Sequence, residues 1–131
     1  MSQARQNSAQ MVGFLRKRIN YVSNGTVLTV GTIPAGASVI GGGVHVVTGF
    51  NDSGTDTVDI GFIGSTTDDN AYATIMDLTN VGWIVLDELA TTTNIQQTVD
   101  TKVTVRYNGQ NSNASAGVAD VIIWFVPNTD N

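Results

Sequence analysis

The chain's only histidine, His45, follows three consecutive glycines in the stretch AGASVIGGGVHVV, where a catalytic base or a phosphate loop could lie. A histidine base needs a serine nucleophile, which hydrolases present on a strained G-x-S-x-G turn. Ser38 lacks the second glycine at that spacing. We therefore expect His45 to be a packed or hydrogen-bonded strand residue and not a catalytic base.

Gly41, Gly42 and Gly43 also fail the two spacings by which glycines bind phosphate. A P-loop requires G-x-x-x-x-G-K-[ST], and a dinucleotide site requires G-x-G-x-x-G between a strand and a helix. No lysine follows these glycines, and Val46 stands where the last dinucleotide-binding glycine would be. Glycines in a strand more often mark a bulge or a close approach of another backbone, which here could belong to a neighbouring chain.

Aspartates could bind a cation, because Ca²⁺ takes several carboxylate and carbonyl oxygens. Six of them lie between positions 52 and 77: Asp52, Asp56, Asp59, Asp68, Asp69 and Asp77. The EF-hand spacing is absent, and Asp favours turns by bonding nearby backbone. Nothing in the sequence selects two facing carboxylates for glycoside hydrolysis. We predict no metal site, no cofactor and no enzyme activity.

Composition limits the remaining classes. The chain has 131 residues, of which 41% are hydrophobic and 13% are charged, and its surface should be polar but weakly charged, as in β proteins and assembly subunits. The absence of cysteine excludes disulfides and thiolate chemistry. The longest apolar run, VIIWFV, is far shorter than the about 20 residues that span a bilayer, so no membrane partner is expected.

Basic residues concentrate at the N-terminus. Four of the six lie within the first 18 positions, which contain no acid: Arg5, Arg16, Lys17 and Arg18. The rest of the chain has 2 basic and 11 acidic residues. No aromatic residue is interleaved with these charges before Phe14, which argues against nucleic acid as a partner. An acidic surface on a partner protein and a solvated tail are the alternatives.

The elements that must position these residues are strands. In VDTKVTVRY, the residues at odd positions from Val99 to Tyr107 suit a core and those at even positions suit water. Six further strands are predicted at 15–22, 26–30, 44–50, 57–63, 83–89 and 118–126, with an eighth possible near Val39. Only 68–79 could hold a helical turn. We predict an all-β fold, an antiparallel, jelly-roll-like β-sandwich over residues 21–131, after a basic N-terminal arm of residues 1–20.

The last predicted strand is apolar on both faces, because VIIWFV contains no polar residue. If one face packs on the core, the other must be covered by something other than water. A second subunit and the protein's own loops are the two alternatives.

From residue 27 to residue 126 the strands and turns follow a specific order. A strand ends in I-P-A-G-A, a V-x-V-x-T-x-F-N strand and a T-V-D-I-G strand follow, D-D-N-A-Y leads to D-L-T, and TKVTVRY and VADVIIWFV close the chain. This order resembles the head decoration, or cement, proteins of tailed bacteriophages. The resemblance implies a non-enzymatic virion protein on the capsid outer surface, a homotrimer that contacts the major capsid protein and stabilises the shell.

The resemblance also suggests which residues make contacts. For the trimer contact the candidates are Ile123, Trp124 and Phe125. For anchoring the arm to an acidic capsid surface or an adjacent subunit, they are Arg5, Arg16, Lys17 and Arg18. The alternatives are a phage tail or fibre component and a carbohydrate- or cell-surface-binding sandwich. The latter would stack sugars on Trp83, Tyr72 or Tyr107.

Overall fold

The computed structural model describes residues 12–89 and 95–128, which form two packed antiparallel sheets. The first sheet has the order β1 (Gly13–Asn20), β8 (Val118–Val126), β3 (Ser38–Thr48) and β6 (Gly82–Val85). The second has the order β2 (Val27–Ile33), β7 (Thr101–Gly109), β4 (Asp56–Ile63) and β5 (Thr67–Asp77). A short 3-10 helix, Tyr21–Ser23, follows β1.

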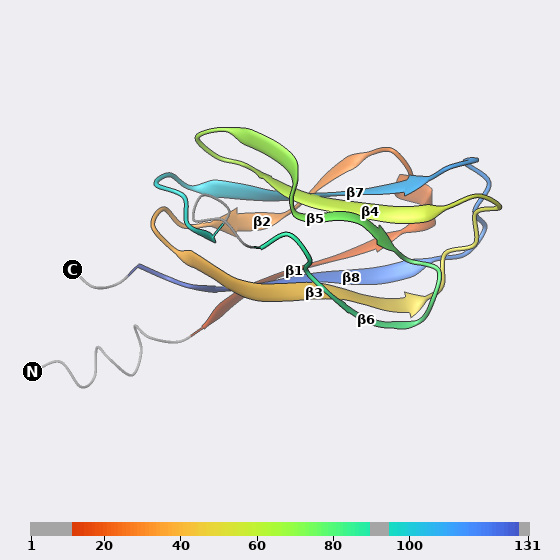
Figure 1. Ribbon diagram of the computed structural model, residues 1–131, viewed down its shortest axis with the longest axis horizontal. Coiled ribbons are helices and arrows are strands. Elements are labelled where there is room, and N and C mark those ends of the chain that lie inside the picture. Colours follow the sequence, from red (N-terminus) through yellow and green to blue (C-terminus); the bar gives the residue numbers. More distant parts are fainter. Residues whose placement is uncertain (1–11, 90–94, 129–131) are drawn as a thin grey trace, which may run out of the picture.

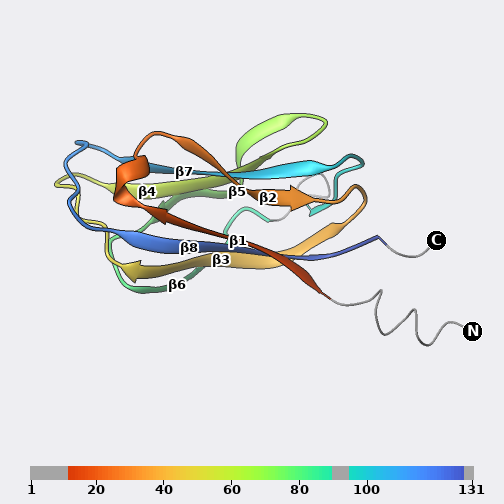
Figure 2. The ribbon, with the colours of Figure 1, turned by 180° about the vertical axis from the view of Figure 1, so that it is seen from behind.

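The strand order is that of a jelly roll. β1 pairs with β8, β2 with β7, β3 with β6 and β4 with β5. These pairs are those of one long hairpin whose closing turn lies between β4 and β5. Pairing of β8 with β3 and of β7 with β4 then joins these pairs into two sheets. Figures 1 and 2 show the two layers from opposite sides. The predicted all-β, jelly-roll-like sandwich is confirmed.

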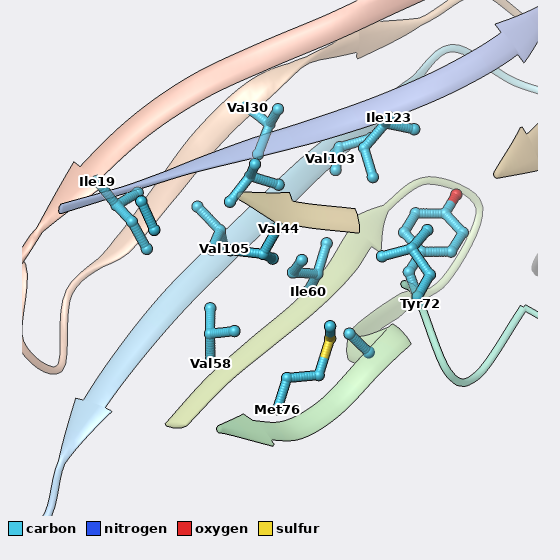
Figure 3. Packing of buried hydrophobic residues seen from close by; sticks show 14 of the residues in the cluster. Ile19, Val30, Val44, Val58, Ile60, Tyr72, Met76, Val103, Val105 and Ile123 are labelled. Carbon is cyan, nitrogen blue, oxygen red and sulfur yellow. The ribbon is translucent and has the colours of Figure 1, made fainter. Parts of the chain in front are cut away.

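The core lies between the sheets and follows the period-two pattern of the strands. Val103, Val105 and Tyr107 of β7 are at most 1% exposed, as predicted. Two residues of the predicted pattern differ, because Val99 precedes β7 and is 40% exposed, and Thr104 is only 4% exposed. The inward-facing residues of β7 meet the inward-facing side chains of the opposite sheet, among them Val44 and Ile123, which are completely buried (Figure 3). Burial of these side chains fixes which face of each strand points outward.

The first strand shows where the sandwich begins. Gly13–Asn20 pair with β8 along their whole length, from Gly13 opposite Phe125 to Asn20 opposite Val118. The sandwich therefore starts at Gly13 and not at residue 21, and residues 13–20 are not part of a separate arm. The physical reason is that Leu15 and Ile19 alternate with charged residues, so this segment has one face that can pack inward. Arg5 lies outside the described residues.

Two predictions of local structure are wrong, the helical turn within 68–79 and the separate strand near Val39. The segment 68–79, predicted to hold a helical turn, forms most of β5. Its strand alternation is hidden because its register against β4 shifts twice and Ile75 has a φ of 53°. The segment near Val39 is not a separate strand, because it continues into the His45 strand as β3.

Candidate interaction surface

The outer face of the β1-β8-β3-β6 sheet carries exposed large apolar side chains. Phe14, Trp83, Val85 and Trp124 are between 41% and 65% exposed, and we call these four residues the aromatic face. Strand register brings them together, because Phe14 lies opposite Trp124 on β1 and β8, and Val85 and Trp83 lie two residues apart on β6. Exposed apolar groups gathered on one face of a soluble protein mark a contact surface.

The outer face of the second sheet is polar instead. Asp59 lies 3.6 Å from Arg106 in an ion pair, and Asn108 donates to the same carboxylate. Lys102 is exposed further along the strand. Exposed apolar side chains do occur on the strands of this sheet, at Val27, Ile63 and Ile75, but none of them is aromatic. The first sheet is therefore the one that gathers exposed aromatic rings.

The glycines of β3 form the floor of the aromatic face. The rings of Trp83 and Trp124 stack with centroids 5.8 Å apart and planes inclined by 28°. A Cβ at Gly41 would stand 3.2 Å from Cε3 of Trp124, and one at Gly43 would stand 2.7 Å from Cζ2 of Trp83. Both indoles therefore rest on backbone that carries no side chain.

Gly42 faces the opposite way, into the sandwich. A Cβ there would overlap the carbonyl oxygen of Ile122 and stand 3.1 Å from Cα of Ile123. Its φ of 148° also disfavours other residues. The backbone that approaches Gly42 and Gly43 most closely is thus the chain's own β8 and β6, which accounts for these two glycines without a neighbouring chain.

The three residues predicted for the subunit contact separate onto two faces of β8. Trp124 points outward and is 41% exposed, whereas Ile123 is completely buried and Phe125 is 9% exposed. Ile123 and Phe125 cannot contact a second subunit without leaving the core, because alternate residues of a strand face opposite sides. Of the three, Trp124 alone is exposed and available for such a contact.

Arg16 and Arg18 share one buried carboxylate. Arg16 Nη2 lies 3.0 Å from Asp120 Oδ2 and Arg18 Nε lies 2.9 Å from Asp120 Oδ1. The hydrogen bond from Arg18 lowers the pKa of Asp120 to about 2, against the opposing effect of burial and with added help from Arg16. Both arginine side chains remain more than half exposed, at 53% and 55%. Two positive charges face one negative charge here, so the site keeps a net positive charge.

Lys17 does not join this cluster. It lies opposite Val121, whose side chain is buried, and so shares the inward-facing side of β1 with Leu15 and Ile19. Lys17 is partly buried where β1 forms the edge of the sheet. An inward-pointing charge on an edge strand discourages pairing with further strands.

His45 lies in the middle of β3, opposite Asp120 on one side and Trp83 on the other. It is a strand residue as expected, but its side chain is exposed and not packed. Within residues 12–89 and 95–128 no hydrogen bond to its side chain is formed, so the expectation of a packed or hydrogen-bonded residue is corrected.

The aspartates mostly hydrogen-bond backbone N–H groups near turns, as expected. Asp52 accepts from Gly54, Asn111 and Asn113 at 2.8 to 3.0 Å, which ties the loop after β3 to the loop after β7. Burial raises the pKa of Asp52, but the hydrogen bonds from these backbone groups outweigh it and the pKa is lowered. Among the described residues, no three His, Cys, Asp or Glu side chains are grouped so as to hold a metal.

The aromatic residues proposed for sugar stacking also separate. Tyr72 and Tyr107 are each 1% exposed, and Tyr107 donates its hydroxyl to Asp56 at 2.5 Å. Burial raises the pKa of Tyr72 to about 12. Of these three residues, only Trp83, at 44% exposure, can receive a ligand.

In the described part of the chain, no helix has the length and hydropathy of a membrane span.

Comparisons with known proteins give similarity in structure but not in sequence. No protein-family model matches the chain, and no curated protein matches its sequence significantly. A chain in the acidic stable capsid structure of Helicobacter pylori bacteriophage KHP30 matches with a TM-score of 0.69 and 18% identity, over 92% of this chain and 91% of that chain.

Two other phage capsids contain similar chains. One, in the capsid asymmetric unit of cyanophage Pam1, matches with a TM-score of 0.68 and 15% identity, over 92% of this chain and 88% of that one. The other, in the capsid of Ralstonia phage GP4, matches with a TM-score of 0.65 and 15% identity, over 95% and 89%. These matches establish a shared fold across almost the whole domain.

Proposed function

We propose that the protein is a non-enzymatic structural protein of a phage virion, one that decorates and stabilises the outer surface of the assembled capsid. The carrying observation is the fold match, which covers at least 92% of this chain and 88% of each capsid chain. Each match therefore relates whole domains and not a shared fragment. A jelly roll alone hosts many functions, so the shared setting of three phage capsids supports this one.

The proposed mechanism is binding energy alone. A homotrimer that contacts several major capsid proteins at once gains avidity from its linked sites. Because it binds the assembled shell in preference to dissociated subunits, it shifts the equilibrium toward the shell. No catalytic residue is needed for this activity.

For the trimer contact we propose the half of the aromatic face formed by β1 and β8. Phe14 is 65% exposed and Trp124 is 41% exposed, and they lie opposite each other in the register of the two strands. Large aromatic side chains that become buried dominate the energy of protein contacts. This replaces the set that included Ile123 and Phe125.

For the anchor to an acidic capsid surface we propose Arg16 and Arg18, whose side chains are more than half exposed. Arg5 and Lys17 stay part of the proposal as charges of the same segment. Deleting residues 1–18 would remove most of β1 and its pairing with β8, so that truncation would test folding and not binding. A deletion of residues 1–11 and, separately, Arg16→Gln with Arg18→Gln give the informative comparison at low and high salt.

The experiment mixes purified protein with undecorated capsids and measures bound protein by co-sedimentation, with the oligomeric state from analytical ultracentrifugation. Trp124→Ala should shift trimer toward monomer and weaken binding at least tenfold, since truncating a buried aromatic anchor costs about 2 kcal/mol or more. Val27→Ala, an exposed apolar residue of the other sheet, is the matched control. A monomeric wild type at micromolar concentration would contradict the trimer.

The place on the particle needs a second measurement. Electron microscopy of the source virion with labelled protein distinguishes the capsid exterior from the tail. Label on the tail or its fibres would favour the alternative of a tail or fibre component and would reject decoration of the head.

A further inference from the structure

An open pocket of about 330 Å³ lies where β6 begins. It is lined by Asp77, Asn80, Val81, Gly82, Trp83 and Ile84, which come from the end of β5, the turn and β6. This volume is at the lower end of those that hold small molecules. The lining combines one aromatic ring, two aliphatic side chains and two polar side chains, a mixture that suits a ligand with both C–H and hydroxyl groups.

The carboxylate of Asp77 is held in place and ionised. Its Oδ1 accepts the hydroxyl of Thr79 at 2.5 Å and the Thr79 backbone N–H at 2.9 Å. These two hydrogen bonds lower the pKa of Asp77, the one from the hydroxyl most. Asp77 Oδ2 has no hydrogen bond to any residue that the structure describes, so it remains free to accept hydrogens from a ligand.

The amide of Asn80 and the ring of Trp83 complete the pocket. Asn80 is exposed, and its side chain makes no hydrogen bond within the described ranges, so the amide can both donate and accept. Trp83 is 44% exposed, and its ring lies over Gly43 and stacks on the ring of Trp124. A ring held this way offers a fixed apolar platform with little entropy left to lose on binding.

Charge excludes anionic ligands from this pocket. None of the residues that line the pocket is Lys, Arg or His. The pocket itself contains the ionised Asp77. Phosphates, sulfates and acidic sugars would therefore be repelled, whereas a neutral polyhydroxylated ring would not.

We propose that this pocket binds a neutral hexose unit of a glycan. The C–H face of the sugar lies on the Trp83 ring, vicinal hydroxyls donate to Asp77 Oδ2, and the Asn80 amide bonds a neighbouring hydroxyl. Glycan binding is a second function of the domain. It does not rest on the capsid role, because neither Phe14 nor Trp124 of the proposed trimer contact lines the pocket, although the Trp83 ring stacks on that of Trp124.

The test uses the full-length protein without capsids. Wild-type protein is screened on an array of neutral and sialylated glycans, and the best neutral hexose is titrated by calorimetry and by tryptophan fluorescence. Trp83→Ala and Asn80→Ala should each lose binding, with Trp83→Ala at least about tenfold weaker. Phe14→Ala, an exposed aromatic residue outside the pocket, should bind as the wild type does, and thermal melting confirms that each variant folds.

Several outcomes would overturn the proposal. They are no binding of neutral glycans by the wild type, binding of sialylated glycans only, or unchanged affinity in both Trp83→Ala and Asn80→Ala. Loss of capsid binding in Trp83→Ala without any glycan binding would make the pocket a protein contact. If the protein does not bind capsids but does bind glycans in a way that depends on Trp83, only the capsid role is rejected.

Discussion

Replacing Gly43 by alanine tests whether the glycine strand supports the paired tryptophans. The added Cβ would overlap the carbonyl oxygen of Ile84 and stand 2.7 Å from Cζ2 of Trp83. The carbonyl belongs to β6, which is paired with β3 at this position, so it cannot rotate away as a side chain could. β6 must therefore shift outward, and overpacking of this kind costs about 1–3 kcal/mol.

The assay is urea denaturation, with near-ultraviolet circular dichroism to report the Trp83–Trp124 stack. Gly43→Ala should lower the free energy of unfolding by about 2 kcal/mol and weaken the tryptophan signal. Gly25→Ala is the control, because Gly25 has a φ of 78° but no atom within 4 Å of the added Cβ. That variant should cost about 1 kcal/mol of backbone strain and leave the tryptophan signal intact. An unchanged stability and an unchanged tryptophan signal in Gly43→Ala would refute the reasoning.

Three further predictions concern the shared carboxylate of Asp120, a buried hydrogen bond and the glycine strand. Asp120→Asn should lose about 1 kcal/mol of stability at pH 7, a value reduced by the exposure of its arginine partners. Since the pKa of Asp120 is lowered on folding to about 2, its stabilising effect is present above the ordinary carboxyl pKa and is lost as pH falls toward 2, where thermal melts of variant and wild type should converge. Tyr107→Phe should cost about 1–3 kcal/mol in urea denaturation, because it leaves buried Asp56 without its phenolic donor. Gly42→Leu should prevent folding itself, seen as loss of soluble β-sheet by circular dichroism, because its side chain would meet the backbone of β8 and not a second subunit.

The fold class could be predicted from the sequence because most strands alternate regularly. In β7, Val103, Val105 and Tyr107 are buried and Lys102 is exposed, as the period of two requires. β5 could not be predicted this way, because two register shifts remove the alternation that identifies a strand. The sequence of the first strand predicts a strand from its alternation, but its basic charge also suggests a separate arm. Only its pairing with β8 distinguishes a strand of the sandwich from an arm.

The assignment of faces on β8 shows a different limit. All six residues of VIIWFV are apolar, so hydropathy does not distinguish the inward from the outward side. The sequence could therefore identify the strand as one that needs cover on both faces, but not that Trp124 alone of the three candidates points outward. Pairing with β1 and β3 determines this, since it sets Trp124 opposite exposed Phe14 and sets Ile123 opposite Gly42.

Contacts between distant residues explain what remained hidden in the candidate surface. Arg16 and Asp120 are 104 positions apart, and no local pattern links a basic N-terminal segment to a single acid in the last strand. The pairing changes the meaning of the charge, because one carboxylate neutralises about half of what the two arginines contribute. The anchor proposed for the capsid is therefore weaker electrostatically than four free charges would be.

The glycine run gains its role from two tryptophans far away in the chain. Glycines at 41 and 43 leave space above β3, and Trp83 from β6 and Trp124 from β8 fill it from either side. The same arrangement separates two proposed activities on one sheet, with Phe14 beside Trp124 on the β1 side and Asn80 beside Trp83 on the β6 side. Phe14→Ala should therefore weaken trimer formation and capsid binding while leaving hexose affinity unchanged. Asn80→Ala should weaken hexose affinity while leaving trimer formation and capsid binding unchanged. Parallel loss of both activities in either variant would mean that the aromatic face acts as a single contact surface.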